Sequence, residues 1–203
     1  MNERYQNLSK MPKQPVAKLL AKAGLKLQVE LDAPASALPD VVLSELDAKA
    51  EWIELLKLMA VLLPPRERVW WACLAARDFI GEKSAKDPLP LAAAEAWVFD
   101  PKEDKREAVL QAMQDAGPND ETVHCASAAL YFNGTLGPGH MAEHPAPPGG
   151  AELSAFAMNV VALGHLSDKF DSHMQMLIDR GLDIARGGSG RIASTASETE
   201  EKA

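Results

Sequence analysis

The chain has 203 residues and a formal net charge of −8, with 47% hydrophobic residues but only 5% aromatics. This length predicts one domain with a substantial core, and the abundance of alanine and leucine favours helix. The negative charge argues against a general nucleic-acid binder, which needs a basic surface. No apolar run reaches the roughly 20 residues that span a bilayer, and no secretory signal is visible. We therefore expect a cytoplasmic protein without membrane insertion.

The N-terminal region differs in charge from the rest of the chain. Residues 1–27 contain six basic side chains and one acidic side chain, Glu3, so the remainder carries −13. We predict that residues 1–13 form a flexible, loosely attached terminus. The alternative is a basic arm that docks on the acidic body of the protein or on a partner.

A short helix is predicted after Pro15, and Gly24 ends it as a C-terminal glycine cap. Residues 25–31, LKLQVEL, alternate apolar and polar side chains as a half-buried strand does. No second strand is evident, so this segment is either an extended linker with its leucines against the helices or a strand that joins a partner's sheet. A structural homo-oligomer built through residues 25–31 is therefore one alternative function. Residues 32–40 predict a turn region.

Residues 52–80 form the most apolar part of the chain and are hinged at Pro64-Pro65. Neither half has a clean polar face, which indicates helices buried on most sides. Pro65 can occupy the first turn of a helix over 65–81, while the preceding helical residues, 41–46 and about 48–63, form one helix or two.

The second half of the chain predicts further helices separated by proline and glycine. Asp100-Pro101 is a start signal for one of them. The expected ranges are about 89–99, 100–116, 119–132, 151–164 and 167–186. Together these elements predict an all-α fold, a single compact domain over 14–187 with about seven to eight helices packed as hairpins.

Two regions fall outside the predicted helices. Residues 133–150, NGTLGPGHMAEHPAPPGG, contain too many prolines and glycines for regular structure, and loops of this length are often functional or disordered. Residues 188–203, which begin with a glycine-rich stretch, predict a disordered tail.

The long loop contains the best metal or acid–base candidates, His140 and His144 with Glu143 between them. Two histidines four residues apart on a helix can share a zinc ion, but a loop lacks that geometry and the HExxH pattern is absent. A small metal-assisted enzyme that uses His140, Glu143, His144 or His165 is thus an alternative to a binding protein.

The other polar groups have simpler interpretations. The segment GHLSDKFDSH, which contains His165 and His173, predicts a capped and charged start of the last helix. Cys73 and Cys125 lie in apolar helical patterns, as reduced core thiols do. His124 is adjacent to Cys125, and neighbouring helical residues point about 100° apart, so they cannot form a thiolate–imidazole pair by themselves.

The adjacent tryptophans Trp70 and Trp71 also point about 100° apart on a helix. If one faces the core, the other can reach a groove or the surface and mark a binding patch. Arg66 precedes Trp70 by four residues, which permits a cation–π contact. The alternative is that both rings are packed in the core.

Three stretches together carry a family resemblance: Leu63 to Arg77 (LPPRERVWWACLAAR), Ala93 to Val98 (AAEAWV) and Gly181 to Gly187 (GLDIARG). Over residues 25–187 the chain resembles the uncharacterised bacterial DUF6931 family of helical proteins. Members are associated with type VI secretion loci, so the resemblance implies an adaptor or chaperone that helps to load an effector onto the secretion spike. It supplies no catalytic residues.

We therefore predict a non-enzymatic protein-binding accessory protein with no catalytic residue, metal or cofactor. The partner would be an effector or spike protein, and the acidic body would favour a basic one through salt-sensitive steering. The predicted contact surface consists of Arg66, Trp70, Trp71, Phe132, His140 and His144.

Overall fold

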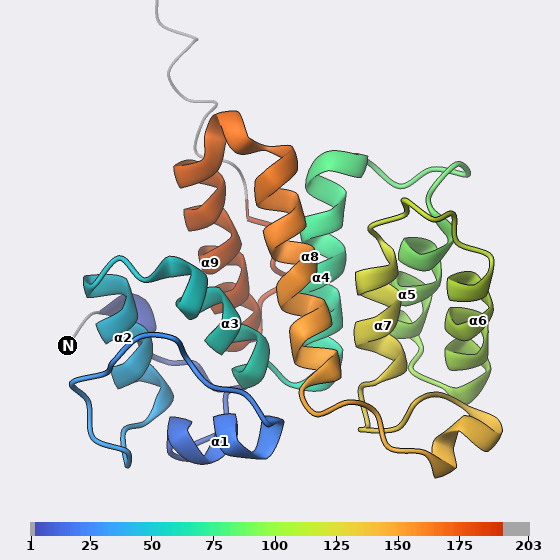
Figure 1. Cartoon of the computed structure of the whole chain (residues 1–203). Helices are drawn as coiled ribbons and strands as arrows, with labels where there is room; N and C mark the ends of the chain where they lie inside the picture. The colour runs from blue at the N-terminus through green and yellow to red at the C-terminus, as the bar shows by residue number, and fades with distance from the viewer. Residues whose placement is uncertain (1–2, 193–203) are drawn as a thin grey trace, which may run out of the picture.

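A computed structural model describes residues 3–192, which fold into nine α-helices without a β-strand (Figure 1). The all-α prediction is confirmed. The helices are α1 (Val16–Ala23), α2 (Pro39–Ala48), α3 (Trp52–Leu62), α4 (Pro65–Ile80), α5 (Leu89–Phe99), α6 (Glu103–Gln114), α7 (Val123–Leu130), α8 (Gly150–His165) and α9 (Phe170–Arg186). Short 3-10 turns occupy Glu3–Tyr5 (η1), Gly139–Glu143 (η2) and Ser167–Lys169 (η3). In this part of the chain none of the helices has both the length and the apolar character needed to cross a membrane.

Local sequence signals explain most of the helix ends. Gly24 adopts the left-handed conformation with φ 65° and donates its N–H to the carbonyls of Leu20 and Ala21, as a glycine cap does. Ala50, with φ 55°, separates α2 from α3, so the two-helix alternative is the correct one. The predicted start at Asp100-Pro101 is wrong, because α6 begins at Glu103 and the Asp100 carboxylate instead accepts from Lys102 at 3.0 Å.

Helices α4 and α8 form the centre of the molecule (Figure 1). On one side, α1, α2, α3 and α9 enclose a first hydrophobic cluster, in which leucine is the most frequent residue. On the other side, α5, α6 and α7 enclose a second cluster, in which alanine is the most frequent residue. Trp71 belongs to the first cluster and Trp97 to the second.

Residues 25–31 run over the first cluster without forming a strand. Leu25, Leu27, Val29 and Leu31 are half-buried against it, whereas the polar residues between them are exposed. The backbone N–H of Gln28 donates to the carboxylate of Glu54 on α3 at 2.9 Å. The alternation of apolar and polar residues is therefore present in the structure. Its apolar side chains pack against the chain's own helices, as the linker alternative predicted.

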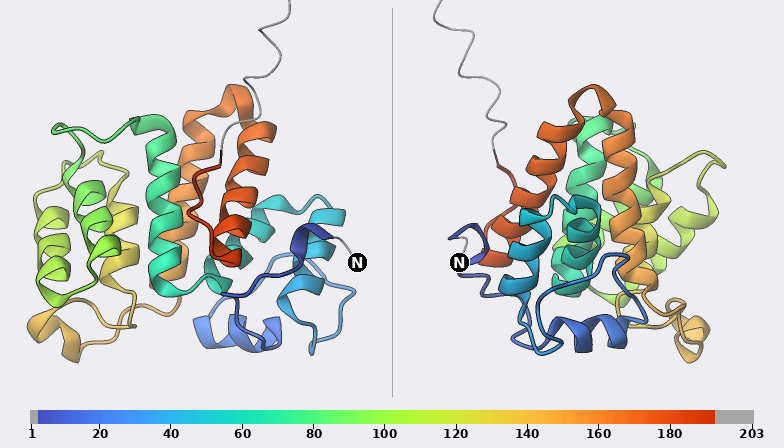
Figure 2. Two further views of the ribbon diagram at one scale, coloured as in Figure 1. Left: turned by 180° about the vertical axis from the view of Figure 1, so that it is seen from behind. Right: turned by 60° about the vertical axis from the view of Figure 1, so that its left-hand side comes forward.

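Residues 3–13, predicted as a flexible and loosely attached terminus, pack against the helices, since Tyr5 is 1% exposed and Met11 is 5% exposed. The predicted tail also needs correction where the structure describes it. The carbonyl of Ser189 accepts from Trp70, and the N–H of Gly190 donates to Asp183 at 2.8 Å. This C-terminal segment lies between α9 and α4 (Figure 2, left). Residues 193–203 of the predicted tail, like residues 1 and 2, lie outside the described part of the chain.

The long loop at 133–150 is folded back on itself. Leu136 N–H donates to the His144 carbonyl, and Ala146 N–H donates to the Gly134 carbonyl, each at 2.9 Å. Arg106 of α6, which is 2% exposed, holds the loop in place. It donates hydrogen bonds to the side-chain oxygens of two loop residues, Asn133 at 2.9 Å and Thr135 at 2.6 Å. A single 3-10 turn, η2, is its regular structure.

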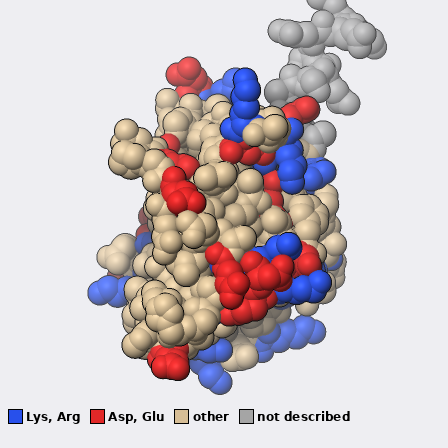
Figure 3. Space-filling model, turned by 90° about the vertical axis from the view of Figure 1, so that its right-hand side faces the viewer, with Lys and Arg blue, Asp and Glu red and all other residues tan. Residues whose placement is uncertain are grey.

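Charged side chains are unevenly spread on the side of the molecule nearest α6. The largest group of acidic and basic side chains lies in one area of that face, smaller groups lie toward its top and bottom, and uncharged residues cover much of the rest (Figure 3). Helix α6 itself begins with Glu103 and Asp104, which lie near the positive end of the helix dipole.

Candidate functional site

The two adjacent tryptophans of α4 have different environments. Trp71 is fully buried, and its indole N–H donates to the Leu177 carbonyl of α9 at 3.0 Å. Gly181, one turn further along α9, leaves room for this ring and for Met59, because a Cβ at that position would lie 2.5 Å from Met59 Cε and 3.2 Å from the indole nitrogen. The prediction that Trp71 belongs to a binding surface is therefore wrong, since its ring joins α4 to α9.

Trp70 lies on a different side of α4 and is half-buried. Its indole N–H donates to the Ser189 carbonyl at 2.7 Å, and the Arg191 guanidinium lies 5.5 Å from its ring centre. The predicted cation–π contact thus involves Arg191 rather than Arg66. Phe99, at the end of α5, meets the Trp70 ring edge-on with centroids 5.7 Å apart. The Phe99 side chain is 62% exposed, the most of any large hydrophobic residue in the described part.

Arg66 supports this aromatic pair from the first turn of α4. Its Nε donates to the carbonyl of Val98, the residue before Phe99, at 2.6 Å. A guanidinium bound to a carbonyl near a helix C-terminus also meets the negative end of the helix dipole. Arg66 therefore fixes the end of α5 and with it the position of Phe99.

A groove of about 750 Å³ opens beside Trp70 and Phe99. Part of its polar lining is already paired. Arg77 Nε donates to Glu95 at 2.7 Å, and its Nη2 donates to Asp87 at 2.6 Å. The hydrogen bond from Arg77 lowers the pKa of Asp87 to about 2, and the bond with Glu95 in turn raises the pKa of Arg77. A rigid ion cluster thus forms one wall, and the exposed aromatic pair offers an apolar contact.

A second ion cluster lies on the other side of α4. Asp78 accepts from His173 Nε2 at 2.9 Å and from Arg180 at 2.8 and 3.0 Å. Burial raises the pKa of Asp78, but the hydrogen bonds from His173 and Arg180 outweigh it and lower the pKa overall. The rest of the His173 segment, residues 164–172, is largely exposed as predicted for a charged helix start, whereas His173 is 4% exposed and departs from that prediction. This cluster fastens α9 to α4.

The remaining predicted contact residues lie elsewhere. Phe132 packs its ring 4.8 Å from Trp97 and 5.2 Å from the Arg106 guanidinium, and it lines a separate groove of about 600 Å³ near the start of α8. His140 and His144 are exposed on and beside η2, and neither lines the Trp70 groove. The predicted six-residue surface is therefore divided, and the structure joins only Arg66 and Trp70 through Phe99.

The alternative of a metal-assisted enzyme finds no assembled site. Within residues 3–192, no group of three or more His, Cys, Asp or Glu side chains is placed to hold a metal ion. His165 instead contacts Glu121 at 2.5 Å and stacks on Phe79 at 4.1 Å. Cys73 and Cys125 are both buried, and burial raises the pKa of Cys73, which disfavours its thiolate.

Phe99 is the residue of this site that the sequence did not reveal. The sequence signal is a bulky apolar side chain in the last turn of an otherwise alanine-rich helix, directly before Asp100-Pro101. That signal is weak, because a terminal aromatic residue is often a core residue. Only the packing of α5 against α4 places the ring at the surface beside Trp70.

The fold and the groove define a helical protein with a partly exposed aromatic pair beside the Arg77–Glu95 ion pair. The description "Family of unknown function (DUF6931)" matches residues 42–185, more than half of the chain, and the chain belongs to this family. The match covers α3 to α8 and most of α2 and α9. No curated protein and no solved structure matches the chain.

Proposed function

We propose that this chain is a non-enzymatic accessory protein that binds a protein partner through the Trp70–Phe99 groove. The observation that carries the proposal is the exposed Phe99 ring, held against Trp70 at the mouth of the groove. Aromatic side chains that are held rigidly at a surface are frequent centres of protein interfaces. The partner would insert an apolar side chain between the two rings and the paired wall of Arg77 and Glu95.

Two features support binding rather than catalysis at this groove. The first is that Glu95, a carboxylate of the groove lining, accepts from Arg77 at 2.7 Å, so it is not free to accept a proton from a substrate. The second is that Asp87, which binds Arg77 but does not line the groove, has a pKa lowered to about 2, far below the neutral range in which a general base works.

The proposal also specifies the kind of protein that the groove binds. The family resemblance suggests an adaptor or chaperone for an effector or spike component of a bacterial type VI secretion system. The net charge of −8 would favour a basic partner, whose association should weaken as salt rises.

The test compares Phe99→Ala with a matched control on the same helix. Leu89, at the start of α5, is 54% exposed and does not line the groove, so Leu89→Ala removes a similar amount of exposed apolar surface. Tagged wild-type protein and both variants would be used for capture from source cells at low and high salt. The captured protein would then be purified for titration.

We expect wild type and Leu89→Ala to capture the same protein, with Phe99→Ala raising its dissociation constant about tenfold or more at unchanged melting temperature. Equal capture by all three proteins would contradict the proposed surface. Capture of nothing at low salt would contradict the accessory-protein proposal itself.

A further inference from the structure

The N-terminal segment, residues 3–13, fills a groove between α2 and α9. Its apolar side chains Tyr5, Leu8 and Met11 recur at every third position and face the first cluster. Tyr5 and Met11 are almost completely buried, while the intervening polar residues reach the surface. The segment therefore contacts the helices as a bound peptide does, with regularly spaced anchors on one side.

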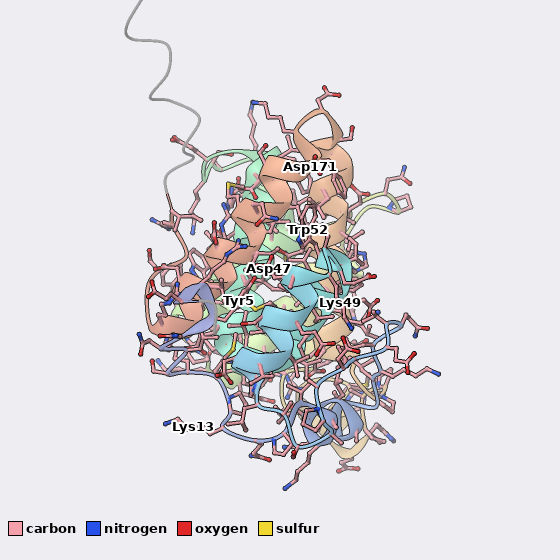
Figure 4. The ribbon with its side chains drawn as sticks, turned by 90° about the vertical axis from the view of Figure 1, so that its left-hand side faces the viewer. Tyr5, Lys13, Asp47, Lys49, Trp52 and Asp171 are labelled. Atoms are coloured by element: carbon pink, nitrogen blue, oxygen red, sulfur yellow. The ribbon has the colours of Figure 1, made fainter. Side chains whose placement is uncertain are left out.

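The walls of this groove are acidic and the segment is basic. Arg4 donates to Asp179 at 2.8 and 3.0 Å and to the Gln175 amide oxygen at 2.8 Å, and it lies 3.4 Å from Asp47 of α2. Further along, Lys10 pairs with Glu67 of α4 at 2.8 Å. The groove thus supplies carboxylates at both ends of the segment. Figure 4 shows Tyr5 and Asp47 on this side of the molecule, where η1, α2 and α9 meet.

Main-chain contacts fix the direction of the segment. Lys10 N–H donates to the Ala185 carbonyl at 2.9 Å, and the Arg186 side chain donates to the carbonyls of Gln6, at 3.3 Å, and Arg4. These bonds depend on the backbone rather than on side-chain identity. A second peptide with the same spacing of anchors could therefore make them equally well.

The segment and the groove differ in their relation to the family. Asp47, Glu67, Gln175 and Asp179 lie inside the region that the family description matches, whereas residues 3–13 lie outside it. The fit of the segment is also incomplete, since a hollow of about 560 Å³ remains between it and the start of α2. The residues that bind the segment therefore lie inside the matched region, and the segment itself lies outside it.

We propose that the groove between α2 and α9 is a peptide-binding site that residues 3–13 occupy in the free protein. The partner it fits is a protein segment with an arginine followed directly by an aromatic residue, and with apolar side chains three and six positions beyond that residue. This site is distinct from the Trp70–Phe99 groove and does not depend on the function proposed for it.

A partner must displace residues 3–13, so the affinity that it needs depends on how tightly this segment occupies the groove. The segment is tied to the fold at Val16, whose N–H donates to the Ala37 carbonyl at 2.9 Å, so its local concentration at the groove is high. Short tethers give effective concentrations in the millimolar range, and a free peptide must exceed that advantage. Weakening the segment's own anchors should therefore expose the site to a peptide in solution.

The experiment uses the full chain with Arg4→Ala and Tyr5→Ala combined, and a fluorescent synthetic peptide of residues 3–13, ERYQNLSKMPK. By fluorescence anisotropy, we expect the double variant to bind this peptide at least about tenfold more tightly than wild type does. The peptide with alanine at the positions of Arg4 and Tyr5 should bind neither protein. Adding Asp179→Asn should weaken binding, whereas Asp171→Asn, an exposed residue on the same helix, should not.

Equal binding by wild type and the double variant, or equal binding of the two peptides, would overturn the proposal. If the double variant does not fold, amide exchange on wild type decides the question. Millimolar peptide should then speed exchange at residues 3–11, and unchanged exchange would overturn the proposal. A concentration-dependent dimer that fills the groove from a second copy would also overturn it.

Discussion

The two hydrophobic clusters on either side of α4 and α8 are built from different side chains. Leucine is the most frequent residue of the first cluster, so its helices are held apart by large side chains that fill the space between them. Alanine is the most frequent residue of the second cluster, which also contains Trp97, so α4, α5 and α7 approach one another closely. The first cluster should therefore be most sensitive to the loss of volume, and the second to added volume.

The largest expected effect is the loss of a buried ring from the first cluster. Trp71→Ala removes a fully buried indole and its hydrogen bond to Leu177, and should lower the free energy of unfolding by about 3–5 kcal/mol. Chemical denaturation measures the change. Trp70→Ala, at the half-buried neighbour, is the matched control and should cost clearly less. Equal losses at the two positions would contradict the assignment of their environments.

The second cluster should respond most to enlargement. Ala129 is fully buried on α7, so Ala129→Leu forces neighbouring helices apart and should cost about 1–3 kcal/mol in denaturant titrations. The exposed Ala108→Leu on α6 is the control and should be close to neutral. A neutral result at Ala129 would show that this cluster is not closely packed.

A smaller effect should follow from the ion clusters that fasten α4 on each side. The pKa values of Asp78 and Asp87 are lowered by their partners in the folded state. Since a lowered folded pKa favours the ionised folded form, this stabilisation is present above about pH 4 and is lost as the pH falls toward 2. Melting temperatures between pH 5 and 2.5 should fall less steeply for Asp87→Asn than for wild type. Identical slopes would mean that Asp87 contributes nothing to the acid response.

The smallest expected change in stability is at the proposed binding groove. Phe99 is largely exposed, so Phe99→Ala should alter the free energy of unfolding by no more than about 0.5 kcal/mol. Thermal melting checks this value. A loss above about 2 kcal/mol would identify Phe99 as a packing residue and remove the basis for the proposed surface.

Helix content could be predicted closely because its signals are local. Pro65 and Gly81 bound α4, and Gly24 ends α1, through backbone geometry that neighbouring residues alone impose. The contact surface could be predicted only in part. Arg66 and Trp70 are joined, but Phe132, His140 and His144 lie apart from them because α7 and its following loop pack on another side of α4.

The contacts of the N-terminal segment could also be predicted only in part, in this case from its charge. Its basic composition was evident, and docking on the acidic body was one of two alternatives. The choice between them depended on tertiary structure. Asp47, Glu67 and Asp179 are far apart in sequence, and they must lie near the sites that bury Tyr5 and Met11. Composition does not contain that information.

The sequence by itself determined that this chain is helical, where most helices begin and end, and which stretches are buried. These properties follow from spacing and from proline and glycine, whose effects act over a few residues. Only the tertiary structure decided which tryptophan is buried, that Phe99 is exposed, and that residues 3–13 fill a groove. Each of these depends on the packing of helices distant in the chain, which sets what every side chain meets.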